Sequence, residues 1–373
     1  MTKILVTGSE GFIGLNLISV LQRINNVAIF QYDVNNTEED LQEALRECDV
    51  IFHLAGVNRP TNDSEFSAGN VELTRVICES LRKIGQTPRI VFSSSTQAEL
   101  DNPYGVSKKM AEGILKRFYQ ETGTDIVVYR MPGIFGKWSR PNYNTVVATF
   151  CYNIARDLPI QVSNQDHVLQ LVYIDDVVQA FCSEIRSERI ENSYCFREVS
   201  PVYKITLSKL AEMINSFHKS RDTLILPNFE DNLTKCLYAT YLSFIQQADF
   251  AYQLPKMKDQ RGVLAEFIKS QTIGQLFVSS TKPGKLRGNH YHHTKAEKFL
   301  ILSGKGIIRF KSIINTDEIF SYEVDGKELK VVDIPPGYTH SIENISNEEM
   351  IVLFWASEIY DSNIPDTDYF PVQ

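Results

Sequence analysis

Residues 3–14, KILVTGSEGFIG, decide the fold of the first half of the chain. A short apolar run typical of a buried strand leads directly into Gly8, Gly11 and Gly14, and then into an apolar segment with helical character. Glycines at this spacing allow a tight turn, close approach of the backbone to a phosphate, and close packing of helix on strand. The stretch predicts a site for the pyrophosphate of a dinucleotide; the alternative is a set of glycines needed only for helix packing.

Short apolar runs alternate with longer amphipathic segments through the first 130 residues. This is the pattern of βαβ units, which build a parallel sheet covered by helices on both faces. We therefore predict an α/β fold, a Rossmann-type doubly wound parallel sheet. Its expected strands are residues 3–7, 27–32, 49–56, 89–95 and 126–131, and its expected helices are about 12–24, 37–47, 64–84 and 104–121.

An acidic residue follows the second expected strand. Asp33 stands nineteen residues after Gly14, where a carboxylate can accept a hydrogen bond from an adenosine ribose hydroxyl. That contact would favour NAD(H) over NADP(H). The alternative is that Asp33 caps the helix expected from about Thr37, since Asp is a favoured capping residue.

A tyrosine and a lysine, Tyr104 and Lys108, lie four residues apart in an expected helix and so share one helix face. An ammonium beside a phenol lowers the pKa of the phenol, which suits Tyr104 to exchange a proton with a carbonyl oxygen while hydride moves at the carbon. A serine ending the preceding strand can hydrogen-bond the same oxygen, and we select Ser95 over Ser94 and Thr96. Such a pair is common on surface helices, so its position after a strand of a dinucleotide fold is what favours catalysis.

Six motifs in this half resemble those of the extended short-chain dehydrogenase/reductases, in the same order over residues 1 to about 245: TGSEGFIG, FHLAGVNRP, SSST, YGVSK, YRMPGIFGKW and LVYIDDVVQAF. Members of that family act largely on nucleotide sugars with NAD(P)(H). The resemblance implies that the catalytic residues are Ser95, Tyr104 and Lys108, and that the cofactor-binding residues are Gly8, Gly11, Gly14, Asp33, Ala55 and Lys108. Two departures are the interval of nine residues from Ser95 to Tyr104 and Gly133, where relatives often carry asparagine.

The sugar nucleotide is expected over about residues 132–248, inside a reductase domain of residues 1–248. A diphosphate needs cationic or amide donors. The candidates are Lys137, Arg140, Asn144, His167 and Lys204. We select Arg140; the alternative for each is a solvated surface residue.

From about residue 250 the helical periods give way to short alternating strands separated by Gly, Pro and Asn turns. This predicts an all-β jelly roll or small barrel over residues 249–373. The expected strands are residues 275–281, 297–302, 305–311, 318–324, 328–334, 340–345 and 349–356.

This second half contains a cluster of metal-ligating residue types. GKLRGNHYHHTKAEKFLILSG (residues 284–304) carries His290, His292 and Glu297, and PPGYTHSIEN carries His340. His290 and His292 are one residue apart on an expected strand, so their side chains point to the same face. Three imidazoles and a carboxylate in one barrel suit a divalent transition metal, with zinc among the candidates.

The spacing of these ligands resembles both motifs of the cupins, except that Leu329 stands where the second motif has a glycine. The resemblance implies a metal-binding jelly-roll barrel, with a metal-free cupin as the alternative. DQRG and KLRGNH further resemble the deoxy-keto-sugar epimerases within the cupins, whose base corresponds to His290. The resemblance therefore gives His290 two competing roles, metal ligand and base.

Composition limits the possible partners. The 373 residues suffice for two or three domains with proper cores. A net charge of −8 and a pI near 5.5 argue against nucleic-acid or anionic-membrane binding. The six cysteines form no CxxC pair, which fits free thiols in a reducing compartment. With no basic leader and no long apolar run, the sequence predicts a cytoplasmic protein without membrane insertion.

A reductase followed by a cupin resembles the bifunctional nucleotide-sugar enzymes of capsule and O-antigen synthesis. The resemblance implies that the cupin inverts C3 of a UDP-4-keto-2-acetamido-2,6-dideoxyhexose, on the way to UDP-N-acetyl-L-fucosamine. The reductase would then reduce the C4 ketone to UDP-2-acetamido-2,6-dideoxy-L-talose. NADP(H), with NAD(H) as the alternative, Zn²⁺ or another divalent metal, and a homodimer are also implied. The alternatives are a 4-ketoreductase whose cupin only binds sugar or dimerises, and a redox sensor with an iron dioxygenase, against which Tyr104 and Lys108 argue.

Overall fold

The computed structural model describes residues 1–373 except 59–61, 63–65, 144, 187–192 and 316, and the chain divides into two compact units. The first comprises Met1–Asn215 and Cys236–Ile245, and the second comprises Ser216–Lys235 and Gln246–Gln373. The domain limits expected from the sequence, 1–248 and 249–373, stay a prediction. No helix within the described residues is long and apolar enough to cross a membrane.

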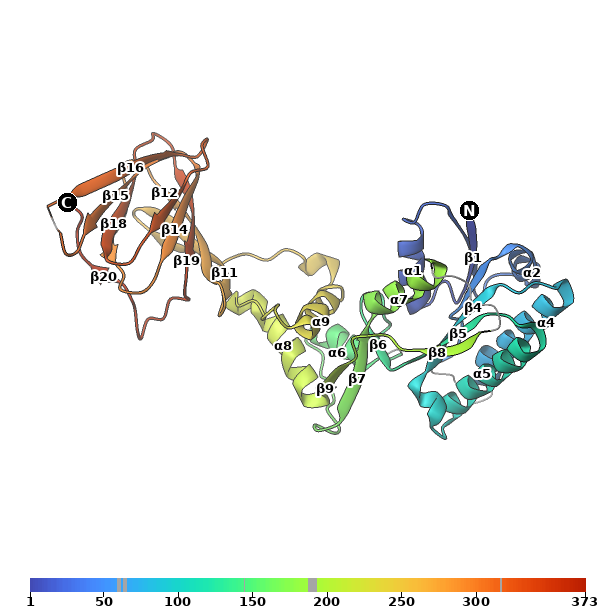
Figure 1. The fold of residues 1–373 in the computed structure, drawn as a ribbon. Helices are drawn as coiled ribbons and strands as arrows, with labels where there is room; N and C mark the ends of the chain where they lie inside the picture. The colour runs from blue at the N-terminus through green and yellow to red at the C-terminus, as the bar shows by residue number, and fades with distance from the viewer. Residues whose placement is uncertain (59–61, 63–65, 144, 187–192, 316) are drawn as a thin grey trace. The chain divides into compact units, whose positions relative to one another are not determined.

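A parallel sheet is the centre of the first unit, with six strands among the described residues in the order β2-β1-β3-β4-β5-β8 (Figure 1). These strands are β1 (Thr2–Thr7), β2 (Val27–Tyr32), β3 (Val50–His53), β4 (Arg89–Ser95), β5 (Ile126–Met131) and β8 (Tyr194–Arg197). Strand β2 is added on one side of β1 and all later strands on the other, so the order reverses between β1 and β3. Ligands of such sheets bind at this switch point, outside the carboxyl ends of the strands.

Helices cover both faces of this sheet. On one face, α1 (Phe12–Leu21) and α7 (Ile174–Arg186) share a core with the strands that includes Leu17 and Phe181. On the other face, α2 (Glu38–Glu47), α4 (Leu73–Ile84) and α5 (Pro103–Thr122) share a second core that includes Leu81 and Phe118. Burying a side chain of this size stabilises the fold by about 1.5–3 kcal/mol. The predicted doubly wound sheet is confirmed.

Local bounds differ from the expectation where the chain enters the site. The strand expected over 49–56 ends at His53, and Leu54 and Ala55 continue as a connection. The helix expected over 64–84 begins with a π-helix (η1, Ser67–Glu72), and residues 64 and 65 lie outside the described part. Thr37 caps α2 in a capping box with Asp40, so the alternative that Asp33 caps this helix is wrong.

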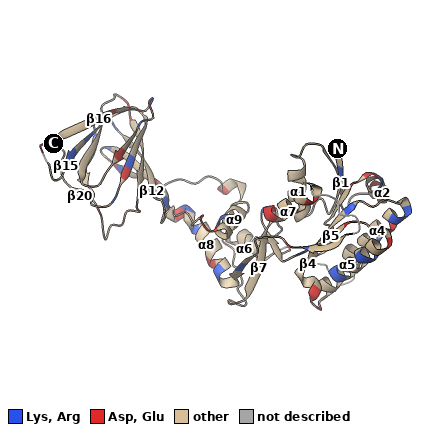
Figure 2. Ribbon diagram, viewed as in Figure 1, with Lys and Arg blue, Asp and Glu red and all other residues tan. Residues whose placement is uncertain are grey.

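The rest of the first unit contains a smaller sheet of β6 (Gly133–Phe135), β7 (Val168–Tyr173) and β9 (Tyr203–Thr206). Further helices of the first unit are α6 (Val146–Ile154) and η2 (Thr96–Glu99). Two more, α8 (Leu207–Thr223) and α9 (Asn232–Leu242), each have residues in both units, and η3 (Gln247–Asp249) belongs to the second unit. Acidic and basic residues are interspersed along α4 and α5, where Arg82 pairs with Glu121 between the two helices (Figure 2). A mixed surface of this kind is a solvated face.

Two antiparallel sheets form the second unit, in the orders β10-β11-β12-β19-β14-β17 and β16-β15-β18-β13-β20 over the described residues (Figure 1). Their strands are β10 (Met257–Asp259), β11 (Gly262–Ser270), β12 (Gly274–Thr281), β13 (Leu286–Tyr291), β14 (Glu297–Ser303), β15 (Lys305–Ser312), β16 (Ile319–Asp325), β17 (Val331–Ile334), β18 (Tyr338–Asn344), β19 (Met350–Ala356) and β20 (Asp368–Tyr369). A core that includes Phe299, Ile308 and Phe354 is shared by both sheets. This is the expected all-β cupin fold.

The residue that departs from the second cupin motif lies in a left-handed backbone conformation. Leu329 has φ +48°, which costs a residue with a Cβ about 1–2 kcal/mol. Strand β17 begins at Val331, whereas the sequence predicted a strand over 328–334. The first positions of the expected strand are therefore part of a turn. A glycine would adopt this turn conformation at lower cost than Leu329 does.

Candidate functional site

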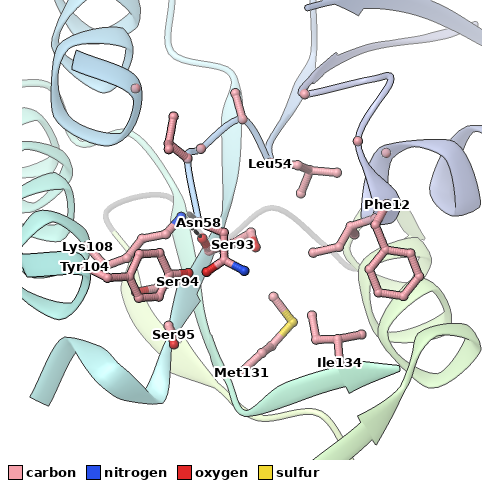
Figure 3. Close-up of a pocket in the computed structure, with 18 of the residues that line it drawn as sticks. Phe12, Leu54, Asn58, Ser93, Ser94, Ser95, Tyr104, Lys108, Met131 and Ile134 are labelled. Atoms are coloured by element: carbon pink, nitrogen blue, oxygen red, sulfur yellow. Dashed lines mark hydrogen bonds between the residues drawn. The ribbon is translucent and has the colours of Figure 1, made fainter. Parts of the chain in front are cut away.

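A cleft of ≈ 650 Å³ lies at the carboxyl ends of the strands of the first unit (Figure 3). Every residue that the sequence assigned to the reductase site lines it: Gly8, Gly11, Gly14, Asp33, Ala55, Ser95, Tyr104 and Lys108. Of the diphosphate candidates, Arg140 also lines the cleft, Lys137 forms an ion pair with Asp175 at 2.8 Å, and Asn144 lies outside the described residues. The cleft is large enough for a cofactor-sized ligand.

The glycine turn is packed so closely that side chains would not fit. Gly8 has φ +71°, and a Cβ on it would lie 2.7 Å from the amide nitrogen of Ala55. A Cβ on Gly14 would lie 2.2 Å from the carbonyl oxygen of Gly8. The carboxylate of Asp33 accepts a hydrogen bond from the amide of Glu10 at 2.7 Å. Asp33 therefore holds the turn in place, in addition to any contact with a ribose.

Gly14→Ala is expected to destabilise the first unit by about 1–3 kcal/mol, because the new methyl group would overlap backbone atoms that cannot move aside easily. It should also weaken cofactor binding by displacing the turn. Thermal unfolding and a fluorescence titration with NAD(P)H measure the two effects. Gly113→Ala is the matched control, since a Cβ there meets nothing within 4 Å on the exposed side of α5. It should stabilise by about 0.5–1 kcal/mol; equal behaviour of the two variants would contradict the steric argument.

Tyr104 projects from the first turn of α5, which Asn102 caps by accepting a hydrogen bond from Gly105 at 2.8 Å. Burial raises the pKa of Tyr104 to about 12, and its hydrogen bond with Ser95 opposes this shift without cancelling it. The expectation that a neighbouring ammonium lowers this pKa is therefore wrong for the structure described. The ammonium of Lys108 lies 6.0 Å from the centroid of the Tyr104 ring and donates instead to the carbonyl oxygen of Ser93 at 2.9 Å.

Lys108 and the serines of β4 have distinct environments. Burial lowers the pKa of Lys108 to about 8, against the opposing charge of Glu112. The hydroxyl of Ser94 donates to Glu112 at 2.5 Å, and Thr96 is exposed. Among the three serine and threonine candidates, Ser95 is the residue that hydrogen-bonds Tyr104.

One residue of this cleft and one beside it went unassigned at the sequence level. Tyr143 lines the cleft, and the interaction between the two phenols is a minor contribution to the raised pKa of Tyr104. Asn70 is buried and holds the adjoining loop, accepting from the amide of Val57 at 2.8 Å and donating to the hydroxyl of Ser107 at 2.9 Å. Neither residue is part of a motif with a fixed spacing. For Tyr143 the sequence did offer one indication, an aromatic residue among polar residues in PNYN.

A second cluster lies in the barrel, where the four predicted ligands come together. One potential ligand atom from each of His290, His292, Glu297 and His340 lies within 4.8 Å of the others. His290 pairs with His340 between β13 and β18, and Glu297 begins β14 in the other sheet. A bulge at Asn289, with φ +62°, shifts the register of β13 immediately before His290. Both sheets therefore contribute ligands to one point.

The electrostatics of this cluster favour a cation. The Nε2 atoms of His292 and His340 each lie 3.4 Å from Oε2 of Glu297. Burial alone would raise the pKa of Glu297, but the two histidines outweigh burial and hold it well below its usual value. Burial, with the neighbouring His340, lowers the pKa of His290 to about 4, so this imidazole is neutral at neutral pH.

Unsatisfied nitrogen atoms support the fit of a metal ion to these residues. Nε2 of His292 and Nε2 of His340 are buried and have no hydrogen-bond partner in the described part of the chain. Such atoms are costly to bury unless a ligand satisfies them. Nδ1 of His292 bonds the carbonyl oxygen of Asp366 at 2.5 Å, which is the outer contact typical of a metal-bound imidazole. The donor set and its geometry fit a divalent transition metal.

These features define a dinucleotide-binding reductase unit of the short-chain type joined to a cupin barrel. The chain belongs to the NAD dependent epimerase/dehydratase family, whose model matches residues 4–193. Residues 257–368 match the Polysaccharide biosynthesis C-terminal domain. The family uses NAD(P), and the chain is accordingly an oxidoreductase of that family.

Two relatives match along nearly the full chain. A UDP-2-acetamido-2,6-beta-L-arabino-hexul-4-ose reductase of Pseudomonas aeruginosa is 41% identical over 98% of this chain and 97% of its own. The crystal structure of the capsular polysaccharide assembling protein CapF from Staphylococcus aureus is 44% identical, covers 99% of both chains and superposes with a TM-score of 0.91. The UDP-glucuronic acid 4-epimerase of Bacillus cereus shares the fold alone, at 16% identity over 66% of this chain with a TM-score of 0.56.

Proposed function

We propose that the chain is a bifunctional nucleotide-sugar enzyme in which the barrel epimerises C3 of a UDP-4-keto-2-acetamido-2,6-dideoxyhexose and the first unit then reduces the C4 ketone with NAD(P)H. The product would be UDP-2-acetamido-2,6-dideoxy-L-talose. The observation that carries the proposal is the presence of two separate chemical sites, Tyr104 with Ser95 beside a dinucleotide cleft and the His290 cluster in the barrel. The reductase named above acts on a 4-ketose of this kind, which supports the substrate class.

The epimerisation is a proton transfer next to a carbonyl. Removal of the C3 proton leaves its electron pair delocalised onto the C4 oxygen, and a proton delivered to the opposite face of C3 completes the inversion. His290 would take the proton, because it is neutral at neutral pH and is the least buried of the four cluster residues. With His290 as the base, the other three residues of the cluster, His292, Glu297 and His340, would hold Zn²⁺ or another divalent metal, which when bound supplies a Lewis acid for the C4 oxygen.

The reduction needs a proton for the same oxygen. The bound cofactor supplies hydride to C4, and Tyr104 would donate its phenolic proton to the oxygen as the C–O bond becomes single. With a pKa of about 12, Tyr104 keeps this proton at neutral pH. Ser95 would orient the oxygen and Tyr104 together, and Arg140 would contact the diphosphate from the rim of the cleft. On the family resemblance, we extend the proposal to a homodimer and to NADPH as the cofactor. Asp33 instead favours NADH, and comparing kcat/KM for the two cofactors tests this choice.

NMR of the products formed in D2O tests the proposal directly. The full chain is incubated with the UDP-4-keto sugar in D2O, first without and then with NADPH. Without cofactor, deuterium should enter C3; with cofactor, the C4 alcohol should form with the C3 configuration inverted. Absence of deuterium at C3 would contradict the epimerase half, and absence of the alcohol would contradict the reductase half.

The pH dependence of reduction should report Lys108. Its ammonium is charged below a pKa of about 8 and neutral above it, so an interaction that needs the charge is present at lower pH and lost as pH rises. We expect kcat/KM for reduction of the epimerised ketone to fall as pH rises through about 8, since this parameter follows the free enzyme. A profile of Lys108→Met should be low and flat on both sides of this pH. A wild-type profile without the fall would contradict a role for the charge.

A second candidate function is a 4-ketoreductase whose barrel binds sugar or dimerises without chemistry. It is favoured by one observation, the name of the Pseudomonas relative, which describes a reductase alone. In that case the chain in D2O would leave C3 unlabelled, while reduction of the 4-ketone would proceed. The experiment above therefore separates the two candidates.

A further inference from the structure

We infer that the last residues of the chain, 366–372, form a strap that positions the metal ligands of the barrel, and that Asp366 is its positioning residue. The inference rests on the metal site proposed above. It concerns residues that lie after all the ligands in sequence and outside the motifs that revealed them.

The carboxylate of Asp366 organises the turn that leads from His292 to Glu297. It accepts hydrogen bonds from the three successive backbone amides of His293, Thr294 and Lys295, at 2.7, 2.8 and 2.7 Å. The hydroxyl of Thr294 donates to the same carboxylate at 3.1 Å. Convergent amides hold the pKa of Asp366 well below its usual value against the effect of burial, so the carboxylate is charged at neutral pH. One side chain thus fixes the turn between two ligands.

The backbone carbonyl of Asp366 determines which ring nitrogen of His292 carries the proton. Its carbonyl oxygen lies 2.5 Å from Nδ1 of His292, and a carbonyl can only accept, so Nδ1 carries the proton. In the neutral imidazole Nε2 is then the nitrogen with the lone pair, and it is the atom that faces Glu297 at 3.4 Å without a hydrogen-bond partner among the described residues. A metal needs this tautomer, because it binds the nitrogen lone pair.

The rest of the strap continues along the ligand strand. Strand β20 pairs with β13, with Tyr369 opposite His290. The amide of Phe370 donates to the carbonyl oxygen of Asn289 at 2.9 Å, and the amide of Val372 donates to the side chain of Asn289 at 3.2 Å. Val372 itself is 1% exposed and anchors the end of the strap. The bulge before His290 is therefore held from the same segment that orients His292.

Cobalt binding by the full-length protein tests the inference. Protein stripped of metal is titrated with Co²⁺, and the visible ligand-field absorption gives both the affinity and the coordination geometry. Asp366→Ala keeps the backbone carbonyl but removes the carboxylate that fixes this carbonyl and the turn against each other. We therefore expect Asp366→Ala to weaken Co²⁺ binding by about 10–100-fold, the range seen when the outer contacts of a ligand are disturbed, and to change the spectrum. Asp366→Asn keeps one acceptor oxygen and should lie between Asp366→Ala and the wild type.

Asp361→Ala is the matched control, because Asp361 is exposed on the same tail and its carboxylate accepts from Asn363 at 2.8 and 3.0 Å. It should bind Co²⁺ as the wild type does. If the wild type itself binds no Co²⁺, the metal site fails and the inference falls with it. If Asp366→Ala binds Co²⁺ with the affinity and spectrum of the wild type, the strap inference is wrong while the metal site stands. The same conclusion follows if Asp361→Ala loses as much Co²⁺ affinity as Asp366→Ala does. Should Asp366→Ala not fold, Asp366→Asn is judged by the same two readouts.

Discussion

Tyr104→Phe is expected to lower kcat for ketone reduction by about 10²–10⁴-fold, the usual contribution of a positioned general acid. The substitution removes the phenolic proton and the hydrogen bond with Ser95, but it keeps the ring that packs 5.8 Å from the ring of Phe66. The cofactor cleft should therefore keep its shape. Oxidation of NAD(P)H with the epimerised ketone measures the loss, and deuterium exchange at C3 should continue at the wild-type rate.

Tyr119→Phe is the control for this variant. Tyr119 lies on the same helix near its far end, 5.9 Å from the ring of Tyr194, and should be dispensable for reduction. A Tyr104→Phe enzyme that reduces the ketone at the wild-type rate would remove Tyr104 from the mechanism. A variant that loses cofactor binding as well would instead indicate that the hydroxyl supports the cleft.

The residues of both sites could be predicted because their signals are local. Gly8, Gly11 and Gly14 follow one strand, and the order of a doubly wound sheet then brings the ends of its other strands to the same edge. In the barrel, His290 and His292 are close in sequence, and the pairing of β18 with β13 supplies His340. Spacing within a segment, combined with a known topology, was enough.

The remaining features depend on tertiary packing that no spacing encodes. The direction of the pKa shift of Tyr104 follows from burial, which the four-residue interval to Lys108 does not reveal. Asp366 binds backbone amides, which every residue type except proline carries, so the residues that it contacts give no signal in the sequence. Asp366 itself lies in a segment without the hydrophobic periodicity of a helix or strand. The strand Tyr194–Arg197 is only four residues long and is recognisable as a member of the sheet through its pairing with β5.

Glu297→Gln is expected to abolish metal binding at ordinary concentrations and to slow deuterium exchange at C3 by about 10²–10³-fold or more. A bound divalent metal stabilises developing negative charge by several kcal/mol, and each ~1.4 kcal/mol corresponds to a factor of ten in rate. Glu297 is the anionic member of the cluster, 3.4 Å from Nε2 of both His292 and His340, and its lowered pKa keeps it ionised. Glutamine has the same shape without the charge, so the barrel should still fold.

Glu323→Gln, on the exposed face of β16, makes the same chemical change away from the cluster and should leave metal content and exchange unchanged. Reduction of an already epimerised ketone should survive in Glu297→Gln, because Tyr104 and the cofactor cleft belong to the other unit. Tyr104→Phe should thus lose reduction and keep C3 exchange, and Glu297→Gln should lose C3 exchange and keep reduction. A mixture of these two variants should restore the full conversion if the epimerised ketone can leave one chain and enter another. Loss of metal with unchanged exchange would show that C3 inversion does not depend on the cluster, and the barrel would then need a different function.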